Sequence, residues 1–585
     1  MLRRALLALA ALTFVVSTPL AQTAVTPKVA DLKTTPESTD YKSTSTYEDV
    51  VKFMKAVTAG SPIMTYTTYG TTSEGRAMPM AVVGTGLSGI TPAAVKATGK
   101  LRVHIQGNVH AGEVEGKESA QGLLREFAMG MHKDWLQTTV FLITPIFNAD
   151  GNERFAMTNR GPQNGPINGQ GTRANAMDLN INRDFMKLET PEGKAFVKLW
   201  NDYDPHVGFD LHTSDGSTHG YYLTYAPGLN PNTSKTILDI QKDEWFPAIT
   251  KNIKAKHGWD TYYYGNVSGG ARGGGRGAGG ARPGGAGAPP AAGAAGAAVA
   301  PPATPPVSMP EVVGAQTPAA PAPPQAWRTF EHVPRFHNNY VGMRNRFAIL
   351  TEAYAYATFK DRILATNYII EEAMNYASAN AAKLKKACAD ADKEAVVATP
   401  LATRAQVKRA GMVDILMGEV EDEMNPNNNA RMNRRKDVVK TVPMFDELWF
   451  EPTTTDIVAS IYYVPAAATK AIALLQLHGV KMTRLTAPVK AATIEQFAIT
   501  ANTQRPQANA SIDLGTHRLR SLEGAWQTAT SDVPAGSYAI DMKQPLARLA
   551  FYLLAPMSDD GLVNWNYLDD MLGDTVKTFP ISRKK

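Results

Sequence analysis

From residue 45 to about residue 390, short apolar runs alternate with longer stretches in which apolar residues recur every three or four positions. The short runs predict buried β-strands and the longer stretches predict amphipathic helices. The predicted strands are "LRVHIQ" (101–106), "TVFLITPIF" (139–147), "HVGFDLH" (206–212) and "RFAILTEAY" (346–354). The predicted helices are 115–129, 191–203, 234–257 and 361–386. This alternation indicates an α/β domain over residues 45–395, with a mixed, mainly parallel sheet flanked by helices.

After about residue 400 the pattern changes to short alternating or apolar runs separated by turn residues. Such runs predict β-strands that follow one another with short connections. The predicted strands are 438–452, 455–465, 471–480, 536–544 and 547–556. Residues 400–585 are therefore expected to form a C-terminal, mostly β domain, arranged as a small sandwich.

Residues 267–326 interrupt the α/β pattern, because this stretch consists mostly of Gly, Ala and Pro. A segment of this composition cannot bury enough apolar surface to offset its ordering entropy, so we predict a disordered insert. It contains a G-x-G-x-x-G string at Gly275, Gly277 and Gly280. No strand leads into that string, and glycine-rich sequence produces it by chance, so no phosphate-binding role is assigned.

The N-terminus combines Arg3 and Arg4 with an apolar run and then small residues, which is typical of a secretory signal peptide. We expect cleavage after Ala21, with Ala24 as the alternative, so that residues 1–21 are removed. A membrane anchor is the competing interpretation, but the apolar run is short for a bilayer span. The sequence thus predicts a periplasmic or secreted protein with no membrane span after signal removal.

The composition of the chain excludes several classes of partner and of metal site. The chain has 585 residues and a formal net charge of +6, which indicates more than one folded unit and only a small basic excess. Lys and Arg form no block interleaved with aromatic residues, so nucleic acid is not an expected partner. Cys388 is the one cysteine in the sequence, which excludes an internal disulfide and zinc sites built from several thiolates. Any metal must be held by histidine and carboxylate.

The stretch "QGNVHAGEVEGKE" (106–118) follows a predicted strand and places His110 three residues before Glu113. Imidazole and carboxylate are the usual protein ligands of a catalytic zinc, although a polar loop would look similar. His212 ends another predicted strand and is the best candidate for a third ligand. Sites in open α/β sheets form at the carboxyl edges of strands, where all three residues are expected. His104 lies inside a strand and is expected to be a core residue.

A metal-assisted hydrolase also needs a base. Glu352 lies near the end of the otherwise apolar strand 346–354. A carboxylate at such a position is costly unless it is paired or functional, although it could also turn outward to solvent.

Taken together, these residues resemble the carboxypeptidase A-like zinc metallopeptidases (the zinc carboxypeptidases) of the secreted bacterial type. The resemblance covers roughly residues 45–390, and leaving out the segment 267–326 brings the interval between His212 and Glu352 closer to the family layout. "DLNINRDF" carries two residues more than the common Asp-Leu-Asn-Arg form, so its family pair is placed by the "NRD" end. The matching motifs, in order, are His110-x-x-Glu113, "FNADG" (147–151), Asn182-Arg183 in "DLNINRDF" (178–185), "FDLHTSDG" (209–216) with His212, and Glu352.

The resemblance implies an exported carboxypeptidase that binds one Zn²⁺ per chain and hydrolyses the last bond of a peptide with a free C-terminal carboxylate. The implied ligands are His110, Glu113 and His212, and Glu352 is the implied general base that activates water. Asn182 and Arg183 would hold the terminal carboxylate of the substrate. Arg173, with Arg160 as a close alternative, would stabilise the oxyanion, and Tyr340 is the candidate for the tyrosine that covers the substrate.

Two other functions stay open at this point. The same zinc site would serve a cell-wall peptide amidase or a deacylase, and a non-catalytic binding protein is a less favoured possibility. Arg344 and Arg346 could lie near the pocket and favour an acidic substrate, or they could be part of the scaffold.

Overall fold

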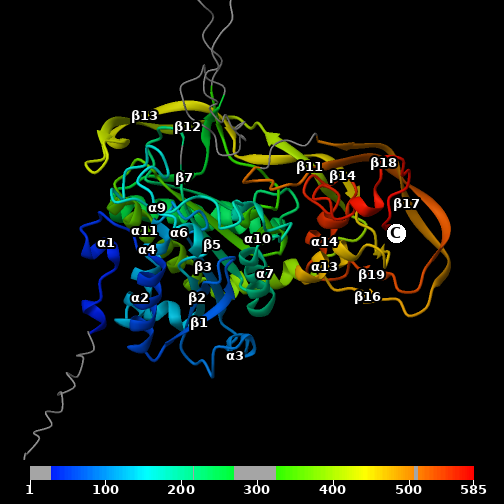
Figure 1. The fold of residues 1–585 in the computed structure, drawn as a ribbon, viewed down its shortest axis with the longest axis horizontal. Coiled ribbons are helices and arrows are strands. Elements are labelled where there is room, and N and C mark those ends of the chain that lie inside the picture. The colour runs from blue at the N-terminus through cyan, green and yellow to red at the C-terminus, as the bar shows by residue number, and fades with distance from the viewer. Residues whose placement is uncertain (1–27, 215, 269–324, 506–510) are drawn as a thin grey trace, which may run out of the picture.

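The computed structural model of the chain describes residues 28–214, 216–268, 325–505 and 511–585 (Figure 1). The predicted signal peptide, residues 1–21, lies outside the described residues, and so does most of the predicted disordered insert. The prediction of disorder is wrong for the two ends of that insert, because they belong to β-strands. Strand β8 (Asn266–Ser268) pairs antiparallel with β9 (Ala326–Arg328), and Val267 packs against the hydrophobic cluster that contains the buried Trp327.

An eight-stranded mixed sheet forms the centre of the N-terminal α/β region, with strand order β1-β2-β4-β3-β5-β10-β6-β7. Its middle strands β4, β3, β5 and β10 run parallel, while β1, β2 and β6 add antiparallel pairs. The predicted fold class, a mixed and mainly parallel sheet with flanking helices, is confirmed. The strands are β1 (Met64–Thr71), β2 (Ala77–Val83), β3 (Leu101–Gly107), β4 (Thr139–Thr144), β5 (Val207–Thr213), β6 (Leu223–Ala226), β7 (Thr261–Tyr263) and β10 (Phe347–Ala353).

Alternate residues of these strands point to opposite faces, and both faces are buried. In β4, Phe141 and Ile143 pack with helices on one face, while Val140 and Leu142 belong to the core on the other. The helices of the first face are α2 (Tyr47–Ala59), α4 (Glu115–Ala128), α9 (Phe246–His257), α11 (Phe359–Ala379) and α12 (Ala381–Lys393). The helices of the second face are α7 (Pro191–Tyr203) and α10 (His337–Met343). Shorter helices are α1 (Thr35–Ser38), α3 (Pro92–Ala97), α5 (Lys133–Thr138), α6 (Ala149–Asn152) and α8 (Lys235–Asp239).

The C-terminal region is rich in strands, as predicted, but the predicted sandwich is wrong. Its six-stranded sheet, ordered β16-β19-β15-β20-β17-β18, shares one core with helices α13 (Thr469–Leu477) and α14 (Ala547–Leu554). Both helices were predicted as strands, because a short apolar run looks alike in either state, and Ala and Leu then favour the helix. The remaining strands are β11 (Pro400–Lys408), β12 (Met412–Met424), β13 (Arg431–Glu447), β14 (Trp449–Ile457), β15 (Ile461–Val464), β16 (Thr483–Arg484), β17 (Val489–Gln504), β18 (Arg520–Val533), β19 (Tyr538–Asp541) and β20 (Ser582–Lys584).

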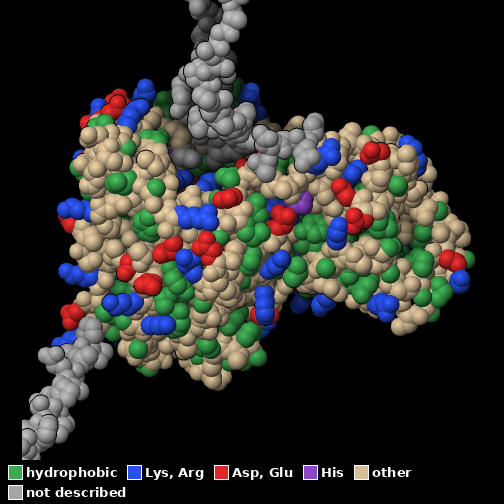
Figure 2. All heavy atoms as spheres, viewed as in Figure 1, with side chains coloured by type: hydrophobic (Ala, Val, Ile, Leu, Met, Phe, Trp, Pro, Cys, Tyr) green, Lys and Arg blue, Asp and Glu red, His purple; other side chains and the backbone are tan. Residues whose placement is uncertain are grey.

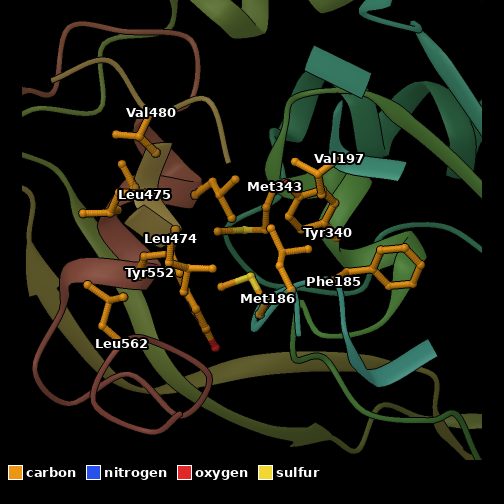
Figure 3. Packing of buried hydrophobic residues seen from close by; sticks show 14 of the residues in the cluster. Phe185, Met186, Val197, Tyr340, Met343, Leu474, Leu475, Val480, Tyr552 and Leu562 are labelled. Carbon is orange, nitrogen blue, oxygen red and sulfur yellow. The ribbon is translucent and has the colours of Figure 1, made fainter. Parts of the chain in front are cut away.

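The two regions are not separated by solvent, because a single hydrophobic core joins the second face of the large sheet to α13 and α14. Figure 3 shows side chains of the α/β region facing side chains of the C-terminal region across this core. Hairpin β12–β13 extends back over the α/β region, where Gly220 N–H donates to the Leu416 carbonyl and Arg435 N–H donates to that of Tyr356 (Figure 1). The labelled core residues are Phe185, Met186, Val197, Tyr340 and Met343 on one side and Leu474, Leu475, Val480, Tyr552 and Leu562 on the other.

A polar contact also joins the two regions and gives a testable pH dependence. The Glu189 carboxylate lies 2.9 Å from Nε2 of His517 and accepts a hydrogen bond from Lys187. Burial alone would raise the pKa of Glu189, but the hydrogen bonds from His517 and Lys187 lower it from 4.5 to about 2. A lowered folded-state pKa stabilises the protein above pH 4.5, and this contribution is lost as the pH falls from 4.5 towards 2.

We therefore expect Glu189→Gln to lower the free energy of unfolding at pH 7 by about 1–2 kcal/mol, allowing for solvent screening of a partly exposed pair. The difference from wild type should shrink as the pH falls below 4.5. Urea unfolding of the metal-free protein at several pH values measures it, with Glu421→Gln on an exposed part of β12 as the control. A difference that stays constant down to pH 2 would contradict the assignment.

Within the described residues, no helix combines the length and apolar character that a membrane crossing requires. Lys and Arg side chains are scattered among Asp and Glu side chains over the face shown in Figure 2.

Candidate metal and substrate site

Three neighbouring parallel strands bring the predicted site residues to one edge of the large sheet. His110 and Glu113 lie in the turn between β3 and α4, and His212 is the penultimate residue of β5. Glu352 on β10 is directly paired with His212 in the parallel register of the two strands. The turn depends on Gly112, because a Cβ there would lie 2.6 Å from Cγ of Arg160 and 2.9 Å from the Gly171 carbonyl. Only glycine therefore fits at position 112, in the turn that carries His110 and Glu113.

His110, Glu113 and His212 converge, and their candidate ligand atoms all lie within 4.8 Å of one another. The two carboxylate oxygens of Glu113 lie 2.9 Å from Nδ1 of His110 and 2.8 Å from Nδ1 of His212. All three side chains are buried. Two imidazole nitrogens and a carboxylate on one centre, bordering a pocket, are the donor set of a catalytic zinc, so these residues fit the metal that the sequence implies.

The outward nitrogens of both histidines are held by other side chains. Nε2 of His110 lies 3.0 Å from Oδ1 of Asn180, and Nε2 of His212 lies 2.8 Å from the buried Asp210 carboxylate. These partners hold the Nε2 protons and leave each Nδ1 facing Glu113, the arrangement that orients histidine ligands in metal sites.

Electrostatics keep the ligand carboxylate ionised. Burial alone would raise the pKa of Glu113, but the charge of Arg160 and the hydrogen bond with His212 hold it well below its ordinary value. Burial together with the positive charge of Arg173 lowers the pKa of His110 to about 3, which keeps that ring neutral. For His212 burial acts in the same direction, but Asp210 and Glu113 outweigh it and raise the pKa well above the ordinary value.

Both candidate oxyanion arginines lie beside Glu113. A guanidinium nitrogen of Arg160 donates to Glu113 over 2.8 Å, and another donates to the Thr213 carbonyl, so this side chain is held in place by protein acceptors. Arg173 approaches the same carboxylate to 3.5 Å, and its side chain is 30% exposed and lines the pocket. The geometry is therefore compatible with the choice of Arg173 over Arg160.

A pocket opens beside the candidate ligands and is lined by two of them, His110 and Glu113. Arg183 lies in its wall with the guanidinium stacked 3.7 Å from the ring centroid of Phe336, while one nitrogen donates to the Asn182 carbonyl. Burial, together with the nearby charge of Arg173, lowers the pKa of Arg183 to about 10, so the side chain remains charged at neutral pH. The pocket is lined by His110, Glu113, Arg173, Asn182, Arg183, Thr213, Tyr264, Phe330, Phe336, Leu350 and Glu352.

Tyr340, the candidate tyrosine, does not lie in the pocket. It is fully buried on α10, its ring packs into the core shared with the C-terminal region, and its hydroxyl lies 2.9 Å from Nδ1 of His478. Helix α10 directs this side chain away from the sheet edge, which the short chain distance to Glu352 did not reveal. The structure does not support a substrate-covering role for Tyr340.

Tyr264 does line the pocket, and sequence reasoning missed it. It stands just before the segment 267–326, so its distance from Glu352 is short only once that segment is left out. Phe330 and Phe336 follow the same segment and were missed for the same reason.

Arg344 and Arg346 belong to the scaffold, because Arg344 donates a hydrogen bond to Asn201 and Arg346 forms ion pairs with Asp204 and Asp392.

Comparison with known proteins agrees with this geometry. Residues 50–237 match the family Peptidase_M14, zinc carboxypeptidase. This part of the chain is a zinc carboxypeptidase domain. The match includes all three candidate ligands as well as Arg173, Asn182 and Arg183, and it ends before Glu352.

The zinc carboxypeptidase domain also has curated relatives. It is 28% identical over 173 residues to Carboxypeptidase 2 of Trichophyton equinum, which is 28% of this chain and 28% of that protein. Carboxypeptidase 2 of Trichophyton rubrum is 27% identical over 173 residues, again 28% of each chain. The chain thus spans less than a third of the length of the curated relatives it matches.

Solved structures similar to the chain include the carboxypeptidase A of Helicoverpa armigera, at 14% identity and a TM-score of 0.39, covering 63% of this chain and 79% of that one. A metallo-carboxypeptidase of Burkholderia cenocepacia has 15% identity and a TM-score of 0.37, covering 57% of this chain and 70% of that one.

Proposed function

We propose that this protein is an exported, zinc-dependent carboxypeptidase that removes the C-terminal residue of peptides. One observation carries the proposal. His110 and Glu113, which converge with His212, border a single pocket that is also lined by a carboxylate, Glu352, and a buried arginine, Arg183. A metal centre, a base and an anchor for a terminal carboxylate are the three parts that this reaction needs.

Each residue of the site has a distinct role in the proposed reaction. When bound, zinc would supply a Lewis acid that polarises the carbonyl of the bond to be cut and lowers the pKa of water. Glu352 accepts a proton from the attacking water and delivers it to the nitrogen of the leaving residue. Arg173 donates to the carbonyl oxygen as that atom gains negative charge.

Arg183, with Asn182, binds the terminal carboxylate of the substrate. A planar guanidinium offers two parallel donors to a carboxylate, and stacking on Phe336 keeps its plane fixed. Burial strengthens the attraction, because little water competes inside the pocket.

We further propose that the residue removed is apolar or aromatic. The pocket wall around Arg183 is formed by the rings of Tyr264, Phe330 and Phe336 and the side chain of Leu350. No acidic or basic side chain other than those assigned to the reaction lines the described pocket, so a charged substrate side chain would lose its hydration without gaining a partner.

For the chain as a whole we propose a signal peptide over residues 1–21, a catalytic domain over 45–395 and a β-rich C-terminal domain over 400–585. Export through the signal peptide would place the enzyme in the periplasm or outside the cell.

The test combines metal removal with a peptide series. The purified enzyme should contain one zinc per chain, and a chelator should abolish hydrolysis, which added zinc restores. Peptides ending in Phe or Leu with a free carboxylate should lose that residue, whereas the same peptides with an amidated C-terminus should be cut at least about 100-fold more slowly, because they cannot engage Arg183 as an anion. Bound zinc with no release from any peptide would instead favour the alternative amidase or deacylase.

A further inference from the structure

The C-terminal region reaches the metal centre through one carboxylate. Asp513 lies in the connection between β17 and β18, and its Oδ1 accepts a 2.7 Å hydrogen bond from Nδ2 of Asn180. The other end of the same amide, Oδ1, lies 3.0 Å from Nε2 of His110. A continuous chain of hydrogen bonds therefore links Asp513, Asn180 and the candidate ligand His110.

The chemistry of the three side chains determines which group donates and which accepts in each of these hydrogen bonds. An ionised carboxylate only accepts hydrogen bonds, so the NH₂ group of Asn180 must face Asp513 and its oxygen must face His110. That oxygen also accepts from Asn182 N–H over 3.1 Å, which is consistent with this orientation. Since an amide oxygen cannot donate, the proton of His110 is held on Nε2, and its Nδ1 lone pair is left for the metal.

The segment that carries Asp513 is docked rather than merely close. Asn180 N–H donates to the Ile512 carbonyl over 2.6 Å, so backbone and side chain of one residue both hold the segment. A few residues on, His517 lies 2.9 Å from the Glu189 carboxylate. Burial alone would raise the pKa of Asp513, but Arg183 and Asn180 hold it below its ordinary value, so the carboxylate is ionised at neutral pH.

We propose that Asp513 is a positioning residue for the metal site, acting through Asn180 on His110, so that full zinc affinity depends on the C-terminal region. The inference rests on the proposed zinc-dependent function. Asp513 touches neither the pocket nor a ligand directly, and it acts by fixing the orientation of the amide and, through it, the tautomer and ring position of His110.

The experiment measures the zinc dissociation constant of the full chain by competition with a chelator. Asp513→Ala should weaken zinc binding about 10-fold or more, the usual cost of losing a partner of a ligand histidine. The matched control is Asp532→Ala, on the opposite end of the same hairpin, where the aspartate is paired with Lys490 at the surface and affinity should stay at the wild-type value. With zinc saturating, Asp513→Ala should lower kcat, because the ring of His110 is less firmly held.

The deciding variant exchanges the two groups. In N180D/D513N a carboxylate faces His110 directly and the amide moves to the outer position, so the hydrogen bond from His110 keeps its direction while the one between residues 180 and 513 is reversed but retained. Zinc affinity should return to within a few-fold of wild type, whereas D513N alone should remain weak, because two amides leave the orientation of Asn180 unfixed.

Equal zinc affinity in wild type and Asp513→Ala would overturn the inference. So would a loss that the exchange does not rescue, because the segment would then act only by covering the site. Thermal unfolding of each metal-free variant separates these outcomes from misfolding. Failure of the wild type itself to bind zinc would overturn the proposed function, and this inference with it.

Discussion

Glu352→Gln should abolish most of the hydrolysis, with kcat about 10²–10⁴-fold below wild type and zinc content unchanged. Glutamine keeps the size of the side chain but cannot accept and return a proton. The measurement is single-turnover release of a C-terminal residue at saturating substrate, together with the zinc content of both proteins.

Strand pairing explains why this one carboxylate is expected to matter so much. Glu352 is the register partner of His212, and both lie at the edge of the sheet that the pocket opens on. Glu113 is the other carboxylate in the pocket, but its two oxygens are directed at the two histidines and at Arg160, so it is not available as a base.

The control for this substitution is Glu451→Gln on β14, where the carboxylate accepts a hydrogen bond from Gln406 at the surface and kcat should not change. A variant at Glu352 that keeps the wild-type rate would place the base elsewhere. One that loses zinc as well as activity would show that Glu352 supports the metal site rather than proton transfer.

Local sequence pattern predicted the parts of this molecule that depend on local chemistry. Strands β3, β5 and β10 are short runs rich in apolar residues and bounded by turn residues, so their ends could be located, and with them the positions of His110, His212 and Glu352. The carboxyl-edge rule then brought these residues together without any knowledge of distances. Glu113 was located by the family motif within "NVHAGE".

What escaped prediction depends on contacts between distant parts of the chain. Asp513 is 333 positions from Asn180, and nothing in its local sequence distinguishes it from a surface aspartate. Tyr264 and Phe330 flank a long Gly/Ala/Pro segment that hides how close they are in space to Glu352. Tyr340 was chosen by its approximate place in the sequence before Glu352, whereas the direction of its side chain is set by the packing of α10 against the C-terminal region.

The same limit applies to α13 and α14. Each is an apolar run of eight or nine residues, too short for the 3.6-residue period to show, and both faces of α14 are buried. In a strand-rich region a short apolar run is more readily predicted as a strand, but α13 packs against α7 and α14 against α10, in the core that the two regions share.

Arg183→Gln should lower kcat/KM for peptides with a free C-terminus by roughly 30-fold to several thousand-fold, equivalent to about 2–5 kcal/mol of lost binding to a buried, charged hydrogen-bond partner. The loss should appear mainly in KM, because Arg183 holds the carboxylate equally in the ground state and the transition state. Hydrolysis of the amidated peptide should hardly change, since that substrate brings no anion for Arg183 to bind.

Two comparisons isolate this effect. Arg173→Gln should instead lower kcat, because its partner gains charge only as the bond is attacked. Arg154→Gln removes a guanidinium that is 40% exposed and paired with Glu74 at the surface, and neither constant should change. If Arg183→Gln lowered free and amidated peptides equally, the terminal carboxylate would not be what Arg183 binds. The site would then fit an internal amide better than a C-terminal bond, since the metal ligands and Glu352 serve both reactions and only the arginine distinguishes them.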